Sequence, residues 1–259
     1  MGDRSAEQRS APGERSPARR QPAAALDKPS LSPRGAPPPP PTADEVFGPA
    51  LGAARQFAEL LASEGVVRGL IGPRETERLW DRHLLNCAGV AELLPETGLL
   101  VDIGSGAGLP GIVLALMRPR LDVVLLEPML RRVDFLRECV STLGLSNASV
   151  RRGRAEDAGG TVRANFVTAR AVAPLDRLAG WAAVLLQPGG ALLAIKGQSA
   201  EDEVRAARPV LQRLGARSTE ILRVGHDKVI PATTVVRVVM SGRGREEQAS
   251  AHRRRPGMA

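Results

Sequence analysis

LLVDIGSGAGLPG, residues 99–111, is an apolar run followed by one acid and then by closely spaced glycines. This order predicts a strand, a tight turn and the start of a helix. Gly104, Gly106 and Gly108 can take a positive φ and carry no Cβ, so the backbone N–H groups of the turn can approach a ligand at a helix N-terminus. We therefore place a binding site at this turn and locate the rest of the chain relative to it.

After residue 97, short apolar runs alternate with amphipathic stretches, which is typical of a parallel sheet covered by helices. The predicted strands are Leu99–Ile103, Asp122–Leu126, Ser149–Arg152, Asn165–Ala169 and Ala191–Ile195, and the predicted helices span about 110–117, 130–143, 175–186 and 200–214. Two later apolar runs, Ser218–Val224 and Thr234–Met240, suit an antiparallel hairpin at the sheet edge. The predicted fold is α/β and Rossmann-like, with a seven-stranded, mostly parallel sheet.

Residues 44–96, before the sheet, carry apolar side chains at helical spacing in two stretches. The first stretch ends at Gly65, and the second begins at Pro73, a residue suited to the first helical position, and runs to about Leu94. Trp80 lies in the second stretch beside three polar residues. It is either a core side chain or part of the rim of a ligand or RNA site.

The two ends of the chain, residues 1–43 and 241–259, are poor in large apolar side chains and rich in Pro, Ser, Ala and Arg. Such segments cannot bury enough surface to order themselves, so we expect two disordered tails around a ligand-binding domain at 97–240. Each tail carries a net charge of +3, out of +8 for the whole chain. The tails either keep the protein soluble or act as basic anchors for nucleic acid.

Several classes of protein are disfavoured by what the sequence lacks. No apolar core of a signal peptide follows the early arginines, and no apolar run approaches the roughly 20 residues that span a bilayer. Cys87 and Cys139 lie in unrelated segments without a partner at metal-ligand spacing, so each is expected to be a small buried hydrophobe. We expect a cytoplasmic monomer that uses neither a membrane nor a metal ion.

The glycine turn matches two kinds of cofactor site. From Gly106 it fits the dinucleotide pattern G-x-G-x-x-G, with Glu127 about 20 residues further on, as in nicotinamide-dependent oxidoreductases. Asp102, two residues before the first glycine, is expected to point into the pocket, where a carboxylate favours the ammonium and sulfonium of S-adenosylmethionine. Glu127 is placed to accept hydrogen bonds from ribose hydroxyls, and Ala155 and Glu156 to read the adenine edge. We favour a class I S-adenosylmethionine methyltransferase and keep the oxidoreductase as the alternative.

The loop Thr168–Pro174, after the fourth strand, limits the acceptor. It lacks the Asn/Asp-Pro-Pro-aromatic sequence of enzymes that methylate adenine or cytosine amines. Carbon-5 methylation of pyrimidines needs a cysteine nucleophile, and neither cysteine is placed for it. The N7 of guanine remains, because it has a free lone pair and loses no proton on methylation. This reaction needs positioning more than a general base.

The positioning role is predicted for Arg170 and Lys196, and no residue is assigned to proton transfer. Arg170 is expected to donate to guanine O6 or to a phosphate, or else to be a salt-bridged surface side chain. Lys196 is expected to bind phosphate or to fix the Arg170 loop. Arg82 and His83 are further candidates for RNA contact. With no tyrosine, four Phe and two Trp, the chain offers little aromatic surface, so we expect the base to stack on an arginine plane or an apolar wall.

Taken together, several stretches resemble the bacterial family of ribosomal RNA small subunit methyltransferase G, also called glucose-inhibited division protein B. They are Trp80–His83, Asp102–Ile112, Glu127–Leu136, Gly153–Glu156, Thr168–Pro174 and Leu193–Gly197, and they cover about residues 45–240. The resemblance implies that S-adenosylmethionine methylates N7 of a guanosine in the 530 loop of 16S rRNA, position 527 in the family's rRNA numbering. The implied partner is 16S rRNA or the small ribosomal subunit.

The resemblance also implies cofactor contacts at Gly104, Leu109, Ala155, Glu156 and Arg170. The full set of expected cofactor-binding residues is Asp102, Gly104, Ser105, Gly106, Gly108, Leu109, Glu127, Ala155, Glu156 and Arg170. A third hypothesis is a non-catalytic RNA-binding module that uses the tails, and it predicts that removing both tails eliminates RNA binding.

Overall fold

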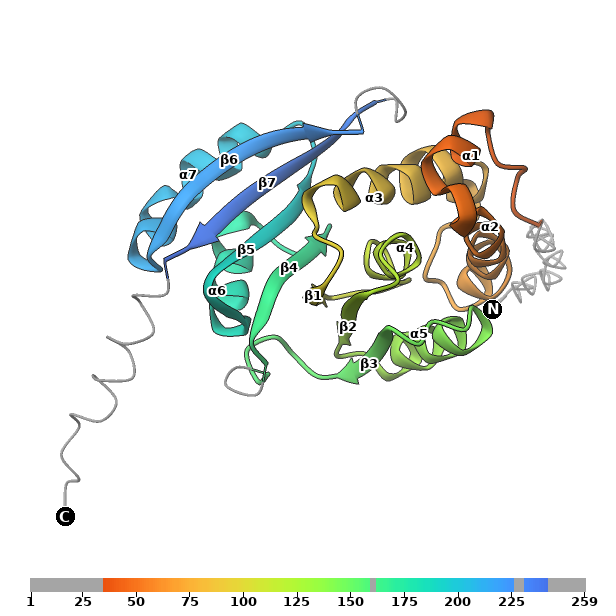
Figure 1. Cartoon of the computed structure of the whole chain (residues 1–259), viewed down its shortest axis with the longest axis horizontal. Coiled ribbons are helices and arrows are strands. Elements are labelled where there is room, and N and C mark those ends of the chain that lie inside the picture. The colour runs from red at the N-terminus through yellow and green to blue at the C-terminus, as the bar shows by residue number, and fades with distance from the viewer. Residues whose placement is uncertain (1–34, 159–161, 226–230, 242–259) are drawn as a thin grey trace, which may run out of the picture. The chain divides into compact units, whose positions relative to one another are not determined.

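The structure is a computed structural model that describes residues 35–158, 162–225 and 231–241 (Figure 1). The expected disorder of residues 1–34 and 242–259 therefore lies outside the described residues. None of the described helices is long and apolar enough to cross a membrane.

The sheet has seven strands in the order β3-β2-β1-β4-β5-β7-β6, which confirms the predicted fold class. The strands are β1 Gly98–Ile103, β2 Leu121–Glu127, β3 Ala148–Arg152, β4 Ala164–Arg170, β5 Leu186–Lys196, β6 Ala216–Val224 and β7 Thr233–Met240. The first five pair in parallel, β7 pairs antiparallel with β5, and β6 closes the edge antiparallel to β7. The predicted terminal hairpin is thus confirmed, with its second strand inserted next to β5.

The order of the strands reverses at β1, because the chain proceeds from β1 to β2 and β3 on one side and then returns to β4 on the other. The carboxyl ends of the strands at such a switch point leave a crevice in which α/β proteins bind ligands. The glycine turn, residues 104–110, begins at this point.

Helices cover both faces of the sheet (Figure 1). Helices α4 Gly111–Met117 and α5 Leu130–Thr142 share one core with the N-terminal helices, and α6 Leu175–Leu185 and α7 Ala200–Arg213 share the other. The side chains of β1 alternate between the two cores: Leu100 belongs to the first core, and Val101 and Ile103 belong to the second. Asp102 therefore faces the core that contains α4.

The N-terminal helical segment follows the two predicted stretches but is irregular. It contains α1 Pro41–Phe47, the 3₁₀ turn Gly48–Ala50, α2 Leu51–Leu60, the π-type turn Leu61–Gly65, the 3₁₀ segment Pro73–Arg78, the π-type segment Leu79–Leu85, α3 Asn86–Ala88 and the 3₁₀ turn Gly89–Leu93. Segments of π-type helix are rare and are often found at functional sites. The one at Leu79–Leu85 presents His83 beside the end of β4, as described below.

The packed part of the chain begins before Asp44, although the sequence analysis predicted that the N-terminal tail extends to residue 43. Helix α1 begins at Pro41, Ala43 is fully buried, and the backbone N–H of Ala36 donates to Glu59 Oε2 at 3.0 Å. Trp80 is a buried core side chain. It packs edge-on against Phe47 with ring centroids 6.1 Å apart, and its Nε1 donates to the carbonyl of Pro37 at 2.8 Å.

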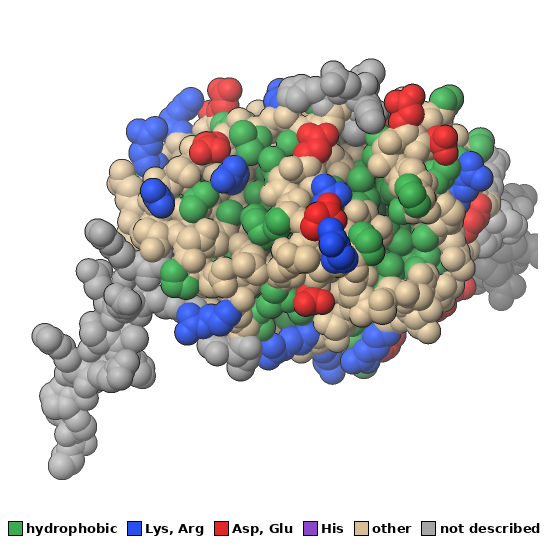
Figure 2. Space-filling view, in the orientation of Figure 1, with side chains coloured by type: hydrophobic (Ala, Val, Ile, Leu, Met, Phe, Trp, Pro, Cys, Tyr) green, Lys and Arg blue, Asp and Glu red, His purple; other side chains and the backbone are tan. Residues whose placement is uncertain are grey.

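Charge is unevenly distributed over the surface. In Figure 2 acidic and basic side chains mix over most of the face shown, and Lys and Arg side chains gather along the lower edge, where β3 and α5 lie in Figure 1. The exposed arginines of these two elements are Arg131, Arg137, Arg151 and Arg152. This edge of the sheet is basic although the region 44–240 has a net charge of only +2.

The start of the packed chain leads to a prediction about truncation. A chain that begins at residue 44 should be less stable than one that begins at residue 35, because it loses the Trp80–Pro37 hydrogen bond and the buried Ala43. We expect a loss on the order of 1–2 kcal/mol, seen as a Tm lower by several degrees in thermal unfolding. Equal Tm values for the two chains would contradict this.

Candidate functional site

A cavity of about 550 Å³ lies at the carboxyl ends of the central strands. Its walls come from the glycine turn, the end of β2, the loop after β3 and the end of β4. Leu70 and Ile71 of the N-terminal segment, His83 and Trp181 complete the lining. The lining therefore joins segments that are separated by up to about a hundred residues in the sequence.

The glycine turn wraps tightly around the end of β2. The N–H of Gly104 donates to the carbonyl of Leu126 at 2.8 Å, and Gly104 and Gly106 have φ angles of 65° and 57°. A Cβ on Gly104 would lie 3.1 Å from both methyl groups of Val172. Glycine is needed at residue 104 for its backbone conformation and for the close approach of Val172.

Asp102 does not take the role that the sequence suggested. It is fully buried, it is absent from the cavity lining, and its Oδ2 accepts a hydrogen bond from the N–H of Gly111 at 3.1 Å. Burial raises the pKa of Asp102 to about 7, so the side chain is not a fixed negative charge at neutral pH. The prediction that it points into the pocket is wrong, because its carboxyl group caps the first turn of α4 inside the core.

Gly108 and Gly111 are required by packing. A Cβ on Gly108 would meet Ile112 at 2.4 Å and Phe57 at 3.3 Å, and one on Gly111 would meet Leu125 at 2.3 Å and Asp102 at 2.6 Å. Gly108 is buried and does not line the cavity, so its expected cofactor contact is not found. It instead lets the turn pack against α2.

Glu127 is buried at the end of β2 and lines the cavity. Its Oε2 accepts a hydrogen bond from the N–H of Gly106, and its Oε1 accepts one from the N–H of Met129, both at 3.0 Å. Arg132 Nη1 lies 3.7 Å from Oε2. Each carboxylate oxygen keeps a second lone pair, so the group is oriented and can still accept hydrogen bonds from a ligand.

The loop after β3 and helix α6 form the wall beside Glu127. Ala155 is buried and Glu156 is exposed, and both line the cavity together with Arg154. Trp181 on α6 also lines it. The sequence analysis did not find Trp181, because a single tryptophan in an amphipathic helix carries no signal that separates a binding side chain from a core side chain.

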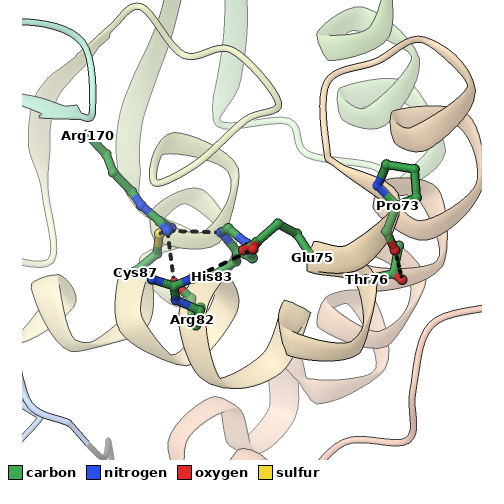
Figure 3. Close-up of polar contacts among 7 residues, drawn as sticks. All are labelled: Pro73, Glu75, Thr76, Arg82, His83, Cys87 and Arg170. Atoms are coloured by element: carbon green, nitrogen blue, oxygen red, sulfur yellow. Dashed lines mark hydrogen bonds and ion pairs between the residues drawn. The ribbon is translucent and has the colours of Figure 1, made fainter.

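Arg170, at the end of β4, is bound to the N-terminal helical segment (Figure 3). Its Nη2 donates to the carbonyl of Arg82 at 2.8 Å and contacts His83 Nδ1 at 2.9 Å, and its Nη1 donates to Cys87 Sγ at 3.2 Å. The other ring nitrogen of His83 lies 3.1 Å from Glu75 Oε2. Arg170 and His83 line the cavity, whereas Arg82 does not.

Lys196 lies outside the cavity lining and is almost buried, with 9% of its side chain exposed. Its Nζ donates to the carbonyl of Ala173 at 2.8 Å and to Glu203 Oε2 at 2.7 Å, and that same carboxylate oxygen accepts the N–H of Leu175. Of its two expected roles, the structure favours fixing the loop after Arg170. Two of the three N–H donors of the ammonium group are used in these contacts.

The two cysteines are not reactive thiolates, and the described residues form no cluster of metal ligands. Burial raises the pKa of Cys87, and it raises that of Cys139 to about 12, so neither is a thiolate at neutral pH. Within residues 35–158, 162–225 and 231–241, no three His, Cys, Asp or Glu side chains gather as metal ligands would.

The structure thus brings together most of the expected site residues. Those that line one cavity are Gly104, Ser105, Gly106, Leu109, Glu127, Ala155, Glu156, His83 and Arg170. Asp102, Gly108, Arg82 and Lys196 support this cavity from outside its lining.

Comparison with known proteins identifies related sequences along most of the chain. The family described as rRNA small subunit methyltransferase G matches residues 51–230. Proteins named ribosomal RNA small subunit methyltransferase G are 58% identical in Thermobifida fusca and 57% identical in Streptomyces coelicolor. The two alignments cover 77% and 78% of this chain and 84% and 85% of the respective relatives.

The fold is also similar to a solved structure from Methanococcus maripaludis, described as a putative S-adenosyl-L-methionine-dependent methyltransferase. The TM-score is 0.50 at 15% sequence identity, and the match covers 74% of this chain and 93% of the other. At this identity the likeness concerns the fold alone.

The buried Asp102 predicts a pH-dependent stability. Because its pKa is raised in the folded chain, the folded state holds the proton more tightly than the unfolded state, so the free energy of unfolding falls as pH rises from about 4 to about 7. Asp102→Asn keeps an acceptor for the Gly111 N–H and should remove this slope, at most ~1.4 kcal/mol per pH unit. Urea unfolding at several pH values measures it, with the exposed Asp122→Asn as control. Parallel pH profiles for the wild type and Asp102→Asn would contradict the assignment.

A second prediction separates the two roles of Lys196. Lys196→Met should lower the free energy of unfolding, measured in urea, by about 2–3 kcal/mol, because it leaves Glu203 without its ammonium partner. The slope of RNA affinity against salt should stay unchanged. Arg205→Met is the matched control, since its pair with Asp202 on the same helix is three-quarters exposed and should contribute below ~1 kcal/mol. A salt slope reduced by about one in Lys196→Met would instead indicate a phosphate contact.

Proposed function

The chain belongs to the rRNA small subunit methyltransferase G family, and on this basis we propose that it methylates N7 of a guanosine in the 530 loop of 16S rRNA. The enzyme class follows from the family: an S-adenosylmethionine-dependent methyltransferase that acts on the RNA of the small ribosomal subunit. The target atom and its place in the RNA are the finer part of the proposal.

The residues around the cavity fit S-adenosylmethionine. When bound, this cofactor supplies an electrophilic methyl group. We assign the turn at Gly104–Gly106 to the methionine part, because all three of its residues line the cavity beside Glu127. The oriented carboxylate of Glu127 suits the ribose hydroxyls, and Ala155, Glu156 and Trp181 suit the adenine.

The observation that carries the proposed acceptor is the lack of an uncommitted base at the Arg170 end of the cavity. Among the described lining residues there, His83 is the one titratable base, and its Nδ1 is occupied by Arg170. Of the lining acids, Glu156 follows β3 and Glu127 ends β2, and these strands are three and two strand spacings from β4, or roughly 14 and 10 Å. An acceptor that must lose a proton would need such a base, whereas guanine N7 does not.

The surface supports an RNA substrate. Arg131 and Arg152 are exposed on the basic edge of β3 and α5, and the exposed Arg154 lines the cavity. Guanidinium groups at such an edge suit phosphate oxygens and would position the RNA without reading its sequence. We further propose a cytoplasmic monomer with a helical segment from Pro41 to about residue 96, a methyltransferase domain at 97–240 and two basic tails that add only mildly to RNA affinity.

The other two hypotheses are less compatible with these findings. A nicotinamide-dependent oxidoreductase is inconsistent with membership of a methyltransferase family. A non-catalytic RNA-binding module would bind RNA through the two tails. It would not need the carboxylate of Glu127 to be held in a fixed orientation in a cavity that is far from both tails in the sequence.

The proposed acceptor is tested with a defined RNA. We expect the full-length protein to transfer labelled methyl groups from S-adenosylmethionine to 16S rRNA or to the 30S subunit, and to fail on RNA that carries 7-deazaguanosine at the target, because that base has a C–H in place of N7. In a strain without the gene, chemical cleavage at N7-methylguanosine in the 530 loop should disappear. Cleavage should return with the wild-type gene and with the exposed Glu220→Gln, but not with Glu127→Ala. Undiminished methylation of the 7-deaza substrate would refute N7 as the acceptor.

A further inference from the structure

Three segments meet at the acceptor end of the cavity in a chain of polar contacts that the sequence did not indicate (Figure 3). Glu75 comes from the 3₁₀ segment Pro73–Arg78, His83 from the π-type segment Leu79–Leu85, and Arg170 from the end of β4. We propose that Glu75 and His83 are positioning residues that fix the guanidinium of Arg170 for methyl transfer, with neutral His83 as the link. The proposal rests on the proposed function, because it assigns Arg170 to the acceptor end of that site.

The donors and acceptors allow only one arrangement of protons. A guanidinium donates and cannot accept, so the 2.9 Å contact requires His83 Nδ1 to be the acceptor and therefore unprotonated. The proton of the neutral imidazole must then lie on Nε2, where Glu75 Oε2 accepts it at 3.1 Å. Glu75 thus selects the tautomer that can hold Arg170.

These contacts leave part of Arg170 free for a ligand. The Nη2 group uses both of its N–H bonds on Arg82 and His83, and Nη1 uses one on Cys87. In the described part of the chain, Nε–H and the second N–H of Nη1 have no hydrogen-bond partner. We call the contacts Glu75–His83–Arg170 the relay. The relay holds one side of the guanidinium against the helical segment and leaves the remaining donors free on a residue that lines the cavity.

The backbone that follows Arg170 is also held in place. Ala171 has a φ of 54°, a left-handed conformation that costs a non-glycine residue energy. Lys196 binds the carbonyl of Ala173, and Val172 packs over Gly104 of the cofactor turn. The relay thus fixes the guanidinium of Arg170. The loop that follows Arg170 is fixed against the glycine turn and so holds the backbone of Arg170.

Protonation of His83 would break the link, because a proton on Nδ1 would face the Nη2 donor of Arg170. The charged groups that face His83 are Glu75, Arg82 and Arg170. Burial and the charge of Arg170 lower the pKa of His83 below its usual value, and Glu75 opposes this shift. The neutral link is therefore stable at neutral pH and is lost as the pH falls through the pKa of His83.

The test compares kcat, the KM for S-adenosylmethionine and the pH profile of methylation of 16S rRNA by the full-length protein. His83→Ala should lower kcat roughly 10- to 100-fold. His83→Asn should recover much of the loss, because the amide oxygen takes the place of Nδ1 as an acceptor that cannot be protonated, and its profile should lose the acid limb. Glu75→Gln should move the acid limb of the wild type to lower pH by up to ~1 unit. The exposed Glu77→Gln is the matched control and should leave the profile unchanged.

An acid limb that persists in His83→Asn, or one that moves equally in Glu75→Gln and Glu77→Gln, would overturn the relay. A second measurement separates this outcome from a failure of the proposed function. Nitrogen-15 NMR of the full-length protein without RNA should show His83 protonated on Nε2, with the signal assigned by its loss in His83→Asn. Arg170→Ala should raise the pH at which His83 titrates, because a neighbouring positive charge is removed. If methylation is absent but these NMR results hold, the proposed function fails and the relay remains; if His83 is protonated on Nδ1, the relay fails.

Discussion

Two acids at the carboxyl ends of adjacent parallel strands hold the glycine turn, and the cavity depends on them. Asp102 in β1 binds the N–H of Gly111, and Glu127 in β2 binds the N–H of Gly106. The parallel register pairs Ile103 with Leu126, so the two strands end together, and their acids bind the glycine turn at Gly106 and the first residue of α4, Gly111, directly after it. One acid is enclosed in the core and caps α4, while the other remains in the cavity lining. Because the same hydrogen bonds shape the turn and orient Glu127, a change in the turn also changes the cavity lining.

The N-terminal helical segment supplies the second constraint. It belongs to the core beneath α4 and α5, and its irregular stretch Leu79–Leu85 carries both buried Trp80 and cavity-lining His83. A change in hydrogen-bonding period rotates successive side chains relative to a regular α-helix. Trp80 is thereby packed against Phe47, and His83 reaches Arg170. The segment therefore supplies part of the cavity lining as well as a cover for the sheet.

Much of the fold was predictable because its signals are local. Strand periodicity and punctuation by Gly and Pro located every strand of the sheet to within a few residues, and the order of elements predicted the parallel core and the terminal hairpin. The largest differences are in where two elements begin. Strand β5 begins at Leu186, five residues before the predicted Ala191, and α1 begins at Pro41, before the predicted start of the helical segment at Asp44. In both places, pairing or packing with a distant segment orders residues whose own composition suggests a turn or a tail.

The sequence by itself determined that several glycines and two acids lie at the switch point of a parallel sheet, and it indicated S-adenosylmethionine in part through an orientation of Asp102 that the structure contradicts. Only the tertiary structure decided what each side chain does there. Asp102 faces α4 because strand alternation puts it on the side of Leu100, and the sequence does not show which side of β1 holds the cavity. Lys196 is bound to the carbonyl of Ala173 and Arg170 to His83 through contacts that join residues 23 and 87 positions apart. Residue types and their spacing determine which groups can react, but the partners that occupy or release those groups are set by long-range packing.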